Sequence, residues 1–367
     1  MRVFVLAAVV CGLFAPAAPA QKKKKEEETQ TLQIPKDLPN TIVGDTRRLT
    51  FYVTRPSAKG LLSQQIRDAL KALFHEAGSD TILKIRAFVA GSGDLRRVRD
   101  LVSEVFTDRR QPLPVLSLIQ SGGLPLEGAQ VILEATAAAK KDVNPDGLVF
   151  ISAQKATSEN PLDPVPPLVT RSLDSLRKAV KAAGSDPGDV VRVTCFLSSL
   201  EKLPDSRRPV EAEYPRAALD FIQTQRAPVQ GLAACEAVAR LRWRTGTRLH
   251  FLNPENLPAE PGQSQIALVT APHLVLTGTQ VSFGYEEKDS RLAMMRLQKA
   301  LEQSGVSTRD VAYAHFYPLS SGIARQVAKI RPEFFDVARA PAGAMLLFEG
   351  LPSMDAGFAV DVVAAKD

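Results

Sequence analysis

The sequence predicts an α+β protein built from three copies of one unit. Three stretches share the same order: an amphipathic helix, a glycine, a short polar turn and a strand rich in β-branched residues. The glycines are Gly78, Gly184 and Gly305. Acidic residues follow at long distances, with Glu134 lying 56 residues after the first glycine and Asp361 lying 56 after the third. Identical long spacings are typical of a repeated unit, so we infer that the chain is a triplication.

The middle copy carries the pattern most clearly. Its helix is SLDSLRKAVKAAG, in which Leu173, Leu176 and Val180 recur at helical spacing and Gly184 stands at the end. The strand VVRVTCFL follows a turn formed by Asp-Pro-Gly-Asp. YPRAALDFI is then predicted as the second helix region, and CEAVA as a strand that carries Glu236, 52 residues after Gly184.

The outer copies repeat this layout. The predicted helices are LLSQQIRDALKALFHEAG and DLRRVRDLVSEVF in the first copy, and DSRLAMMRLQKALEQSG and GIARQVAKIRPEFFDVA in the third. A Leu-Pro pair lies 46 residues after the glycine in both, beginning at Leu124 and Leu351. Loops rich in Pro, Asn and Gly separate the copies, which we place at residues 45–140, 141–243 and 244–367.

Taken together, these motifs resemble the Rid family, the reactive intermediate deaminases, which are also called endoribonuclease L-PSP proteins. GLVFISAQ (147–154) and HLVLTGTQ (273–280) stand where the family has a strand ending in SGQ, and AGSDPGDVVRVTCFL matches its helix end and third strand. The first copy is the most diverged, because LTFYVTR has Arg55 where the others have Gln154 and Gln280. The resemblance covers about residues 45–367.

The resemblance implies a fold and an assembly. Rid proteins have a chorismate-mutase-like fold, in which a mixed sheet is backed by two helices. They form homotrimers with a ligand cleft at each subunit boundary. A chain with three copies is therefore expected to build an intramolecular pseudo-trimer and to remain a monomer, because covalent linkage raises the effective concentration of the partners.

The chemistry implied by the resemblance is hydrolysis of an α-imino acid to a keto acid and ammonia. A family arginine holds the substrate carboxylate through two parallel hydrogen bonds, and a glutamate on the last strand positions water. This chain departs from that pattern. Aligning each copy on its proline places Leu116, Gln230 and Gly343 at the arginine position, and the middle copy then lacks about 12 residues before Glu236.

The candidate site residues follow from this alignment. Glu236 and Arg226 are the candidate catalytic residues, with Arg226 reaching the cleft from four residues before Gln230 or remaining an exposed loop arginine. The carboxylates on the last strands need partners, either a substrate-bound water or a backbone amide or arginine where copies meet. The glutamines line a cleft or make structural hydrogen bonds. The candidate substrate-binding residues are Gln154, Gln230, Gln280, Glu134 and Asp361.

The N-terminus predicts export to the periplasm or the extracellular space. Residues 1–20 have an early arginine, an apolar run and a final Ala-Pro-Ala, which is typical of a cleaved signal peptide, with a retained anchor as the alternative. Val9 and Val10 are too bulky for lipoprotein processing at Cys11. QKKKKEEET begins a charged leader that we place at residues 21–44 and expect to be solvated.

Composition excludes several other functions. Cleavage near Ala20 leaves 45 Lys and Arg against 40 Asp and Glu, a mild excess without the basic stripe typical of nucleic-acid binding. The four histidines show no metal-ligand spacing, and no phosphate-binding glycine loop is present, so we predict neither metal nor cofactor. Cys195 and Cys235 lie in apolar strands, where we favour buried free thiols over a disulfide.

Two functions compete at this point. One is an exported imine or enamine deaminase, a hydrolase with weakened or altered substrate grip, which the resemblance supports. The other is a non-catalytic protein that binds a small ligand or serves as a scaffold, which the missing arginines support. RNA cleavage has no support, because neither an acid–base pair nor a base-stacking surface is apparent.

Overall fold

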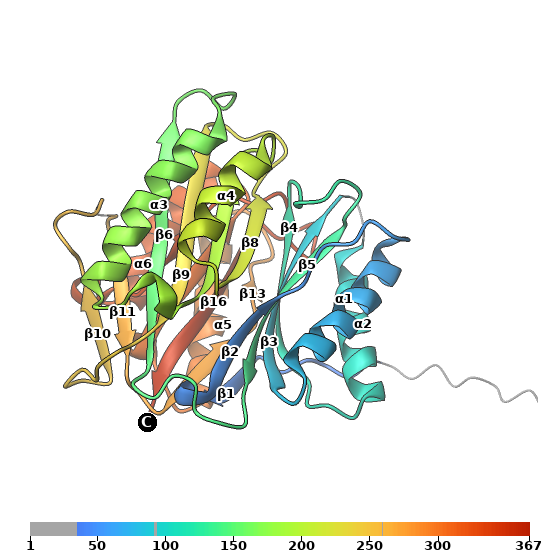
Figure 1. Cartoon of the computed structure of the whole chain (residues 1–367). Coiled ribbons are helices and arrows are strands. Elements are labelled where there is room, and N and C mark those ends of the chain that lie inside the picture. The colour runs from blue at the N-terminus through green and yellow to red at the C-terminus, as the bar shows by residue number, and fades with distance from the viewer. Residues whose placement is uncertain (1–34, 92–93, 259) are drawn as a thin grey trace, which may run out of the picture. The chain divides into compact units, whose positions relative to one another are not determined.

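The computed structural model describes residues 35–91, 94–258 and 260–367. The predicted signal peptide and the leader up to residue 34 lie outside the described residues. Within them, three β-sheets and six α-helices form the predicted α+β fold (Figure 1). No helix in this part of the chain is long and apolar enough to cross a membrane.

The first copy has a four-stranded sheet of order β2-β5-β3-β4, and its two helices cover one face (Figure 1). A buried leucine and isoleucine stripe attaches α1 to the sheet, as predicted. Its elements are β2 (Leu49–Val53), α1 (Leu62–Ala77), β3 (Thr81–Ala90), α2 (Leu95–Asp108), β4 (Val115–Ser121) and β5 (Val131–Ala138).

The middle copy has a six-stranded sheet of order β10-β11-β6-β9-β7-β8. The strand predicted at residues 190–197 is confirmed as β7, but YPRAALDFI is wrong as a helix region. Helix α4 ends at Glu213, and this segment enters β8, which pairs in parallel with β7. The elements are β6 (Leu148–Ser158), α3 (Val165–Ala182), β7 (Val190–Leu197), α4 (Leu203–Glu213), β8 (Ala218–Gln223) and β9 (Gly231–Arg240).

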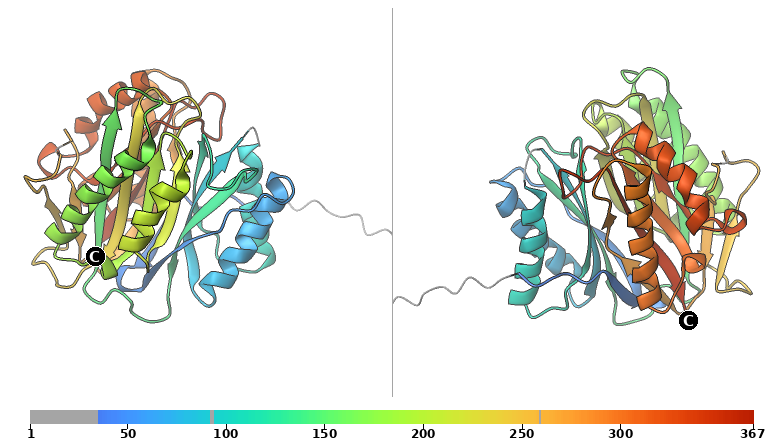
Figure 2. Two further views of the ribbon diagram at one scale, coloured as in Figure 1. Left: turned by 45° about the horizontal axis from the view of Figure 1, so that its top comes forward. Right: turned by 180° about the vertical axis from the view of Figure 1, so that it is seen from behind.

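The third copy has a six-stranded sheet in which β1 joins β12, β16, β14 and β15, and β13 pairs with β16. Figure 2 shows α5 and α6 together on one face of this sheet. Its elements are β12 (His273–Thr277), β13 (Gln280–Val281), α5 (Glu287–Gln303), β14 (Val311–Pro318), α6 (Ser321–Phe334), β15 (Ala342–Met345) and β16 (Phe358–Lys366).

Three strands outside the repeated elements belong to the sheet of a copy other than the one that follows them in the chain. β1 (Thr41–Asp45) precedes the first copy but pairs with β12 of the third. β10 (Leu249–Leu252) and β11 (Ile266–Val269) lie within residues 244–367, which were predicted as the third copy, but β11 pairs with β6 of the middle one. Strand pairing therefore begins within the segment predicted as leader, and it extends the middle sheet beyond residue 243. The two segments that contain these strands therefore connect copies through backbone hydrogen bonds.

The glycines that define the repeat have a common backbone role. Gly78, Gly184 and Gly305 follow the first helix of their copies with φ of 57°, 73° and 75°. Residues with a β-carbon are strained in this left-handed conformation, whereas glycine adopts it freely and ends the helix.

Apolar packing occurs at two levels. Each copy has its own core between its helices and its sheet. Two further clusters combine side chains from all three copies. Leu83, Phe150 and Leu276 belong to one of these shared clusters, and Phe88 and Phe196 belong to the other. The inner faces of the three sheets are therefore buried against one another.

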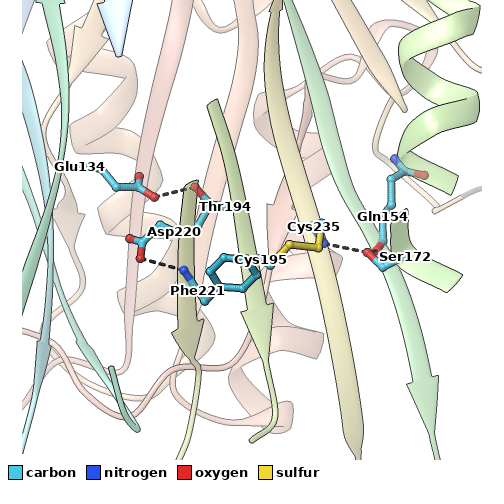
Figure 3. Close-up of a disulfide and its surroundings, with 8 residues drawn as sticks. All are labelled: Glu134, Gln154, Ser172, Thr194, Cys195, Asp220, Phe221 and Cys235. Atoms are coloured by element: carbon cyan, nitrogen blue, oxygen red, sulfur yellow. Dashed lines mark hydrogen bonds between the residues drawn. A yellow bond between two sulfur atoms is a disulfide. The ribbon is translucent and has the colours of Figure 1, made fainter. Parts of the chain in front are cut away.

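The middle copy contains a disulfide between Cys195 and Cys235 (Figure 3), so our preference for free thiols was wrong. The cysteines stand directly opposite each other on the antiparallel strands β7 and β9. Side chains at such positions lie on the same face and close together. Spacing along the sequence did not reveal this register.

Removal of this disulfide should destabilise the protein. Its loop spans 40 residues, and cross-links of this kind typically contribute about 2–4 kcal/mol. We expect Cys195→Ala/Cys235→Ala to lower the unfolding free energy by about that amount in a denaturant titration. In the wild-type protein, mass spectrometry after alkylation under denaturing conditions should find both cysteines protected until a reductant is added. Alkylation without reductant would contradict the pairing.

Candidate functional site

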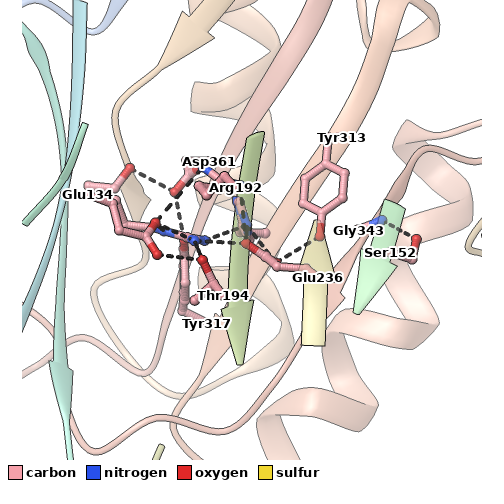
Figure 4. Close-up of polar contacts among 12 residues, drawn as sticks. Glu134, Ser152, Arg192, Thr194, Glu236, Tyr313, Tyr317, Gly343 and Asp361 are labelled. Atoms are coloured by element: carbon pink, nitrogen blue, oxygen red, sulfur yellow. Dashed lines mark hydrogen bonds and ion pairs between the residues drawn. The ribbon is translucent and has the colours of Figure 1, made fainter. Parts of the chain in front are cut away.

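The acidic residues of the three copies occupy equivalent positions in the sheets. In the first copy Glu134 on β5 stands opposite Arg86 on β3. The corresponding pairs are Thr194 and Glu236 in the middle copy, and His315 and Asp361 in the third. All six residues are buried between the two shared apolar clusters. Figure 4 shows four of them, Glu134, Thr194, Glu236 and Asp361, close together.

Arg86 joins two of these carboxylates. Its Nε donates to Glu134 at 2.6 Å, and its Nη2 donates to Glu236 of the middle copy at 2.8 Å. Thr194 also donates to Glu134, at 2.5 Å. The Arg86 side chain is only 3% exposed, so both ion pairs are shielded from water. One arginine of the first copy thus neutralises charge on two copies.

The carboxylate of the third copy is neutralised mainly by the first copy. Lys84 donates to Asp361 at 2.6 Å and Ser117 donates at 2.7 Å, both from strands of the first copy. Tyr317 of the third copy adds a donor at 2.9 Å, and His315 Nδ1 lies 3.2 Å away. Asp361 is fully buried, so these groups replace its hydration.

Glu236 has the largest set of partners. Besides Arg86, it accepts a hydrogen bond from Tyr313 at 2.8 Å and one from Arg192 at 3.3 Å. His315 Nε2 lies 3.1 Å from both of its oxygens. Three copies thus supply partners to one carboxylate. The partners found for the strand carboxylates are side chains of their own copy and of the neighbouring copies.

The pKa values in this cluster follow from burial and pairing. Burial alone would raise the pKa of Glu236, but His315 and Arg86 hold it well below the ordinary carboxyl value. Burial is likewise outweighed at Asp361, where Lys84 and His315 keep the pKa well below normal. Both groups are therefore ionised over the whole physiological pH range, as salt-bridged carboxylates are expected to be.

Asp220 on β8 is an exception among the buried acids. Its side chain faces Glu134 (Figure 3), and the one donor to it among the described residues is the backbone N–H of Phe221, at 2.8 Å. The second carboxyl oxygen is buried and has no donor among the described residues. Burial and the charge of Glu134 raise the pKa of Asp220 well above its ordinary value, although Arg86 opposes the shift. A protonated Asp220 can donate to Glu134, which satisfies both groups.

The structure does not bring the two candidate catalytic residues together. Arg226 is 62% exposed and forms an ion pair with Glu349 of the third copy at 2.9 Å. Glu236 is fully buried in the ion cluster. No hydrogen bond or ion pair joins these two described residues. A catalytic role for either residue remains a prediction.

The sequence alignment placed Gln230 at the same position as Leu116 and Gly343, but the strand register places Leu219 there. Leu116, Leu219 and Gly343 occupy the same position on β4, β8 and β15. They precede the acidic residues of their copies by 18, 17 and 18 residues, so the middle copy is one residue shorter here and not about 12. Gln230 instead lies in the exposed loop before β9. None of the three equivalent residues is an arginine.

A cleft of about 380 Å³ lies between the first and third copies. Leu116 and Leu118 of β4 form part of its floor, and Gly278 and Thr279 of the third copy form the opposite wall. A β-carbon on Gly278 would lie 2.8 Å from the Leu116 carbonyl oxygen, so only glycine permits this approach. The wall is continued by Val281 and Phe283 beside Gln280, which is half-buried in β13.

The rim of this first–third cleft is basic. Arg96 and Arg99 reach it from α2, together with Asp100. Arg99 also approaches Asp37, which is fully exposed, at 3.3 Å. The Arg96 side chain forms no ion pair within the described residues. Two guanidinium groups above an apolar floor can bind a carboxylate with an apolar body.

A second cleft, of about 730 Å³, lies between the first and middle copies. Leu219 and Phe221 line it from β8, and Arg55 lines it from the first copy. Arg207, on its rim, is paired with Glu211 at 2.5 Å. The cleft is wide and open.

The third junction, between the middle and third copies, is filled by the chain itself. Gln263 donates to the Gly343 carbonyl at 3.0 Å, while the Gly343 N–H donates to Ser152 at 2.8 Å. Gln154 donates to Gln265 at 3.1 Å and to the Ser152 carbonyl. The linker before β11 thus occupies the position that the open clefts leave accessible. Gln154 makes structural hydrogen bonds there.

Several residues of the ion cluster were not identified from the sequence. Lys84 and Arg86 alternate in ILKIRAFV, and Tyr313 and His315 alternate in VAYAHFY. Charged or polar side chains at every second position of an apolar strand share one face, and this was the available signal. Among the described residues no group of three or more His, Cys, Asp or Glu is placed to hold a metal ion.

The fold and the cluster define a class: a triplicated α+β protein whose copies meet around buried ion pairs. No protein-family model matches the chain, and no curated protein sequence matches it. Structures of the Rid family, also called YjgF, do match, each over about a third of the chain.

Three of these structures illustrate the similarity. A Rid-family protein of unknown function from Yersinia pestis is 16% identical and covers 33% of this chain and 100% of its own, with a TM-score of 0.31. A YjgF-family member from Neisseria meningitidis is 15% identical over 32% of this chain and 95% of its own, with a TM-score of 0.25. A YjgF-family member from Mycobacterium tuberculosis is 20% identical over 32% and 99%, with a TM-score of 0.24.

Loss of Arg86 should destabilise the protein strongly. Arg86→Met leaves two buried carboxylates without their main cation, which typically costs about 3–5 kcal/mol. Arg177→Met is the control, because Arg177 is 49% exposed and pairs with Glu213 on the surface, where such pairs contribute about 0–1 kcal/mol. Denaturant titrations that place both variants within 1 kcal/mol of wild type would contradict the role of Arg86.

Asp220 should make stability depend on pH. Its raised pKa means that the folded protein holds a proton that the unfolded chain has released. The unfolding free energy therefore falls as pH rises above the ordinary carboxyl range, by at most about 1.4 kcal/mol per pH unit, until the folded pKa is passed. Asp220→Asn remains neutral and should gain stability relative to wild type as pH rises. The exposed control Asp205→Asn should follow the wild-type curve, and a constant difference between Asp220→Asn and wild type would exclude this account.

Proposed function

We propose that this chain is an exported Rid-like protein whose three copies form an intramolecular pseudo-trimer, and that it binds a small carboxylate-bearing molecule in the first–third cleft. The observation that carries the binding proposal is the pair of arginines, Arg96 and Arg99, above an apolar floor. This corresponds to the non-catalytic alternative raised by the sequence.

The pseudo-trimer proposal is supported by the cyclic order of contacts. The strand β4 of the first copy meets Gly278 of the third, where Thr279 donates to the Leu116 carbonyl. β8 of the middle copy shares a cleft with Arg55 of the first. β15 of the third copy binds Ser152 of the middle one. Each copy therefore presents the same strand to the same segment of the next copy.

The chemistry of the first–third cleft supports a carboxylate ligand. Guanidinium groups bind carboxylates through paired, charge-assisted hydrogen bonds, each contributing about 1.5–3 kcal/mol when solvent is excluded. Leu116 replaces the family arginine on the strand, so the floor is apolar and the cations come from α2. The ligand is therefore expected to combine an anionic end with an apolar body.

Imine hydrolysis is a second candidate function, supported by one residue. Asp100 lines the same cleft and is half-buried, so it can orient a water molecule towards a bound C=N bond. The carboxylates on the last strands contribute less to this proposal, because Glu134, Glu236 and Asp361 are already engaged by buried donors. We therefore expect imine hydrolysis by this protein to be slow at most.

The binding proposal predicts one ligand per chain. Calorimetric titration with pyruvate, 4-methyl-2-oxopentanoate and phenylpyruvate should give affinity that rises with apolar size and is lost in the corresponding amides. Arg96→Ala/Arg99→Ala should weaken binding at least tenfold. Arg97→Ala is the matched control, since Arg97 lies on the same helix but pairs with Glu104 at 2.9 Å. Light scattering on the same samples should give a monomer.

Other outcomes would overturn parts of this proposal. Equal affinity in all variants would contradict the proposed binding site. An obligate trimer of the full chain would contradict the proposed intramolecular assembly. Ammonia release from freshly generated imino acids tests the second candidate, and Asp100→Asn should abolish it. N-terminal sequencing of secreted material that still begins at Met1 would contradict export by signal cleavage near Ala20.

A further inference from the structure

A small cavity lies beside the ion cluster, where the inner faces of the three copies meet. Its volume is about 30 Å³, which is room for one or two water molecules or one small ion. Lys84, Arg86 and Arg192 line it, whereas Glu134 is the one carboxylate among the described residues that does so. The wall of this cavity is therefore more positive than the ion cluster as a whole.

Two of the cations have hydrogen-bonding capacity left over. The Lys84 ammonium group has three N–H donors and makes one side-chain hydrogen bond, to Asp361. The Nε of Arg192 is buried and has no acceptor within the described residues. The Nη2 of Arg192 reaches Glu236 at 3.3 Å, which leaves the Nε free for another partner. Buried donors of this kind normally have one.

The cations also repel one another. Burial lowers the pKa of Lys84, and the charges of Arg86 and Arg192 lower it further, while Asp361 opposes the shift. A negative charge placed between Lys84 and Arg192 reduces this repulsion. It also supplies the acceptor that the free donors lack.

The remaining wall restricts which anion can enter. Leu49, Phe51, Phe150 and Leu276 surround the polar groups, and the Phe51 ring lies 5.7 Å from the Arg192 guanidinium carbon. A large or strongly hydrated anion would have to exchange its water shell for apolar contacts, which is costly. A monovalent ion of one atom loses less hydration and needs less space.

We infer that this cavity binds a single small monovalent anion, with chloride as the physiological candidate, between Lys84 of the first copy and Arg192 of the middle copy. Tyr313 and His315 of the third copy complete the wall, so the anion contacts all three copies. An ion bound in this way stabilises the docked state of the copies, since it binds the folded protein and not the unfolded chain. This inference does not depend on the proposed function of the clefts.

Halide-dependent stability tests the inference. At constant sodium concentration, replacing 100 mM gluconate by chloride or bromide should raise the melting temperature by roughly 2–4 °C, because gluconate is too large for the cavity. Arg192→Met should abolish this difference. Arg242→Met is the matched control in the middle copy, since Arg242 pairs with Asp186 and Asp189 at the surface, and it should retain the difference.

Diffraction provides a readout that does not require any variant to fold. Crystals of the wild-type protein soaked in bromide should show an anomalous peak within hydrogen-bonding distance of Lys84 Nζ and Arg192 Nε. A cavity without this peak, or a melting temperature that does not distinguish bromide from gluconate, would overturn the inference. Equal loss of the halide effect in Arg242→Met would also overturn it, because the effect would then not belong to this cavity.

Discussion

The burial of three carboxylates at one place is the constraint on which the rest of the structure depends. Glu134, Glu236 and Asp361 come from three different copies and are almost completely removed from water. A buried charge left without a partner costs several kcal/mol, so each carboxylate needs a partner once docking of the copies removes it from water. Their main cations, Arg86 and Lys84, both belong to the first copy. Arg86 pairs with Glu134 within the first copy, whereas its pair with Glu236 and the pair of Lys84 with Asp361 form only when the copies are docked. The shared apolar clusters on both sides exclude water from these pairs.

Because the copies are joined in one chain, they can provide partners for the buried carboxylates with different side chains. The position opposite the strand carboxylate is Arg86 in the first copy, Thr194 in the middle copy and His315 in the third. A homotrimer would have to repeat one residue three times, and three arginines at this position would bring three like charges together. Here one arginine bridges two carboxylates, and a threonine and a histidine complete the set. These three different residues are possible because the copies are parts of one chain and need not have the same sequence.

Sequence patterns predicted the parts of this structure that depend on local geometry. The helix, glycine and strand order was predictable because positive φ and hydrophobic periodicity act over a few residues. The strand carboxylates were found by their spacing, but their partners were not, since Arg86 and His315 become neighbours of Glu236 only after three copies dock. The middle-copy equivalence failed for a related reason. Ala218–Gln223 is short and follows a helix directly, so its parallel pairing with β7 had no local signal, and Gln230 was placed at a position that belongs to Leu219.

The strand position shared by Leu116, Leu219 and Gly343 has different surroundings at each boundary between copies. In the third copy a β-carbon on Gly343 would lie 2.1 Å from the Ala314 carbonyl oxygen, and the linker already hydrogen-bonds to Gly343, so no side chain can point there. In the first copy Leu116 turns the same position into an apolar floor, and cations approach from α2. In the middle copy Leu219 lies beside Asp220, whose side chain contacts Glu134 of the first copy. The three equivalent positions thus lie in a cleft of about 380 Å³, in a wider open cleft and in a filled junction. Because the surroundings differ at each of the three positions, an arginine introduced on one strand would not by itself create a symmetric set of sites.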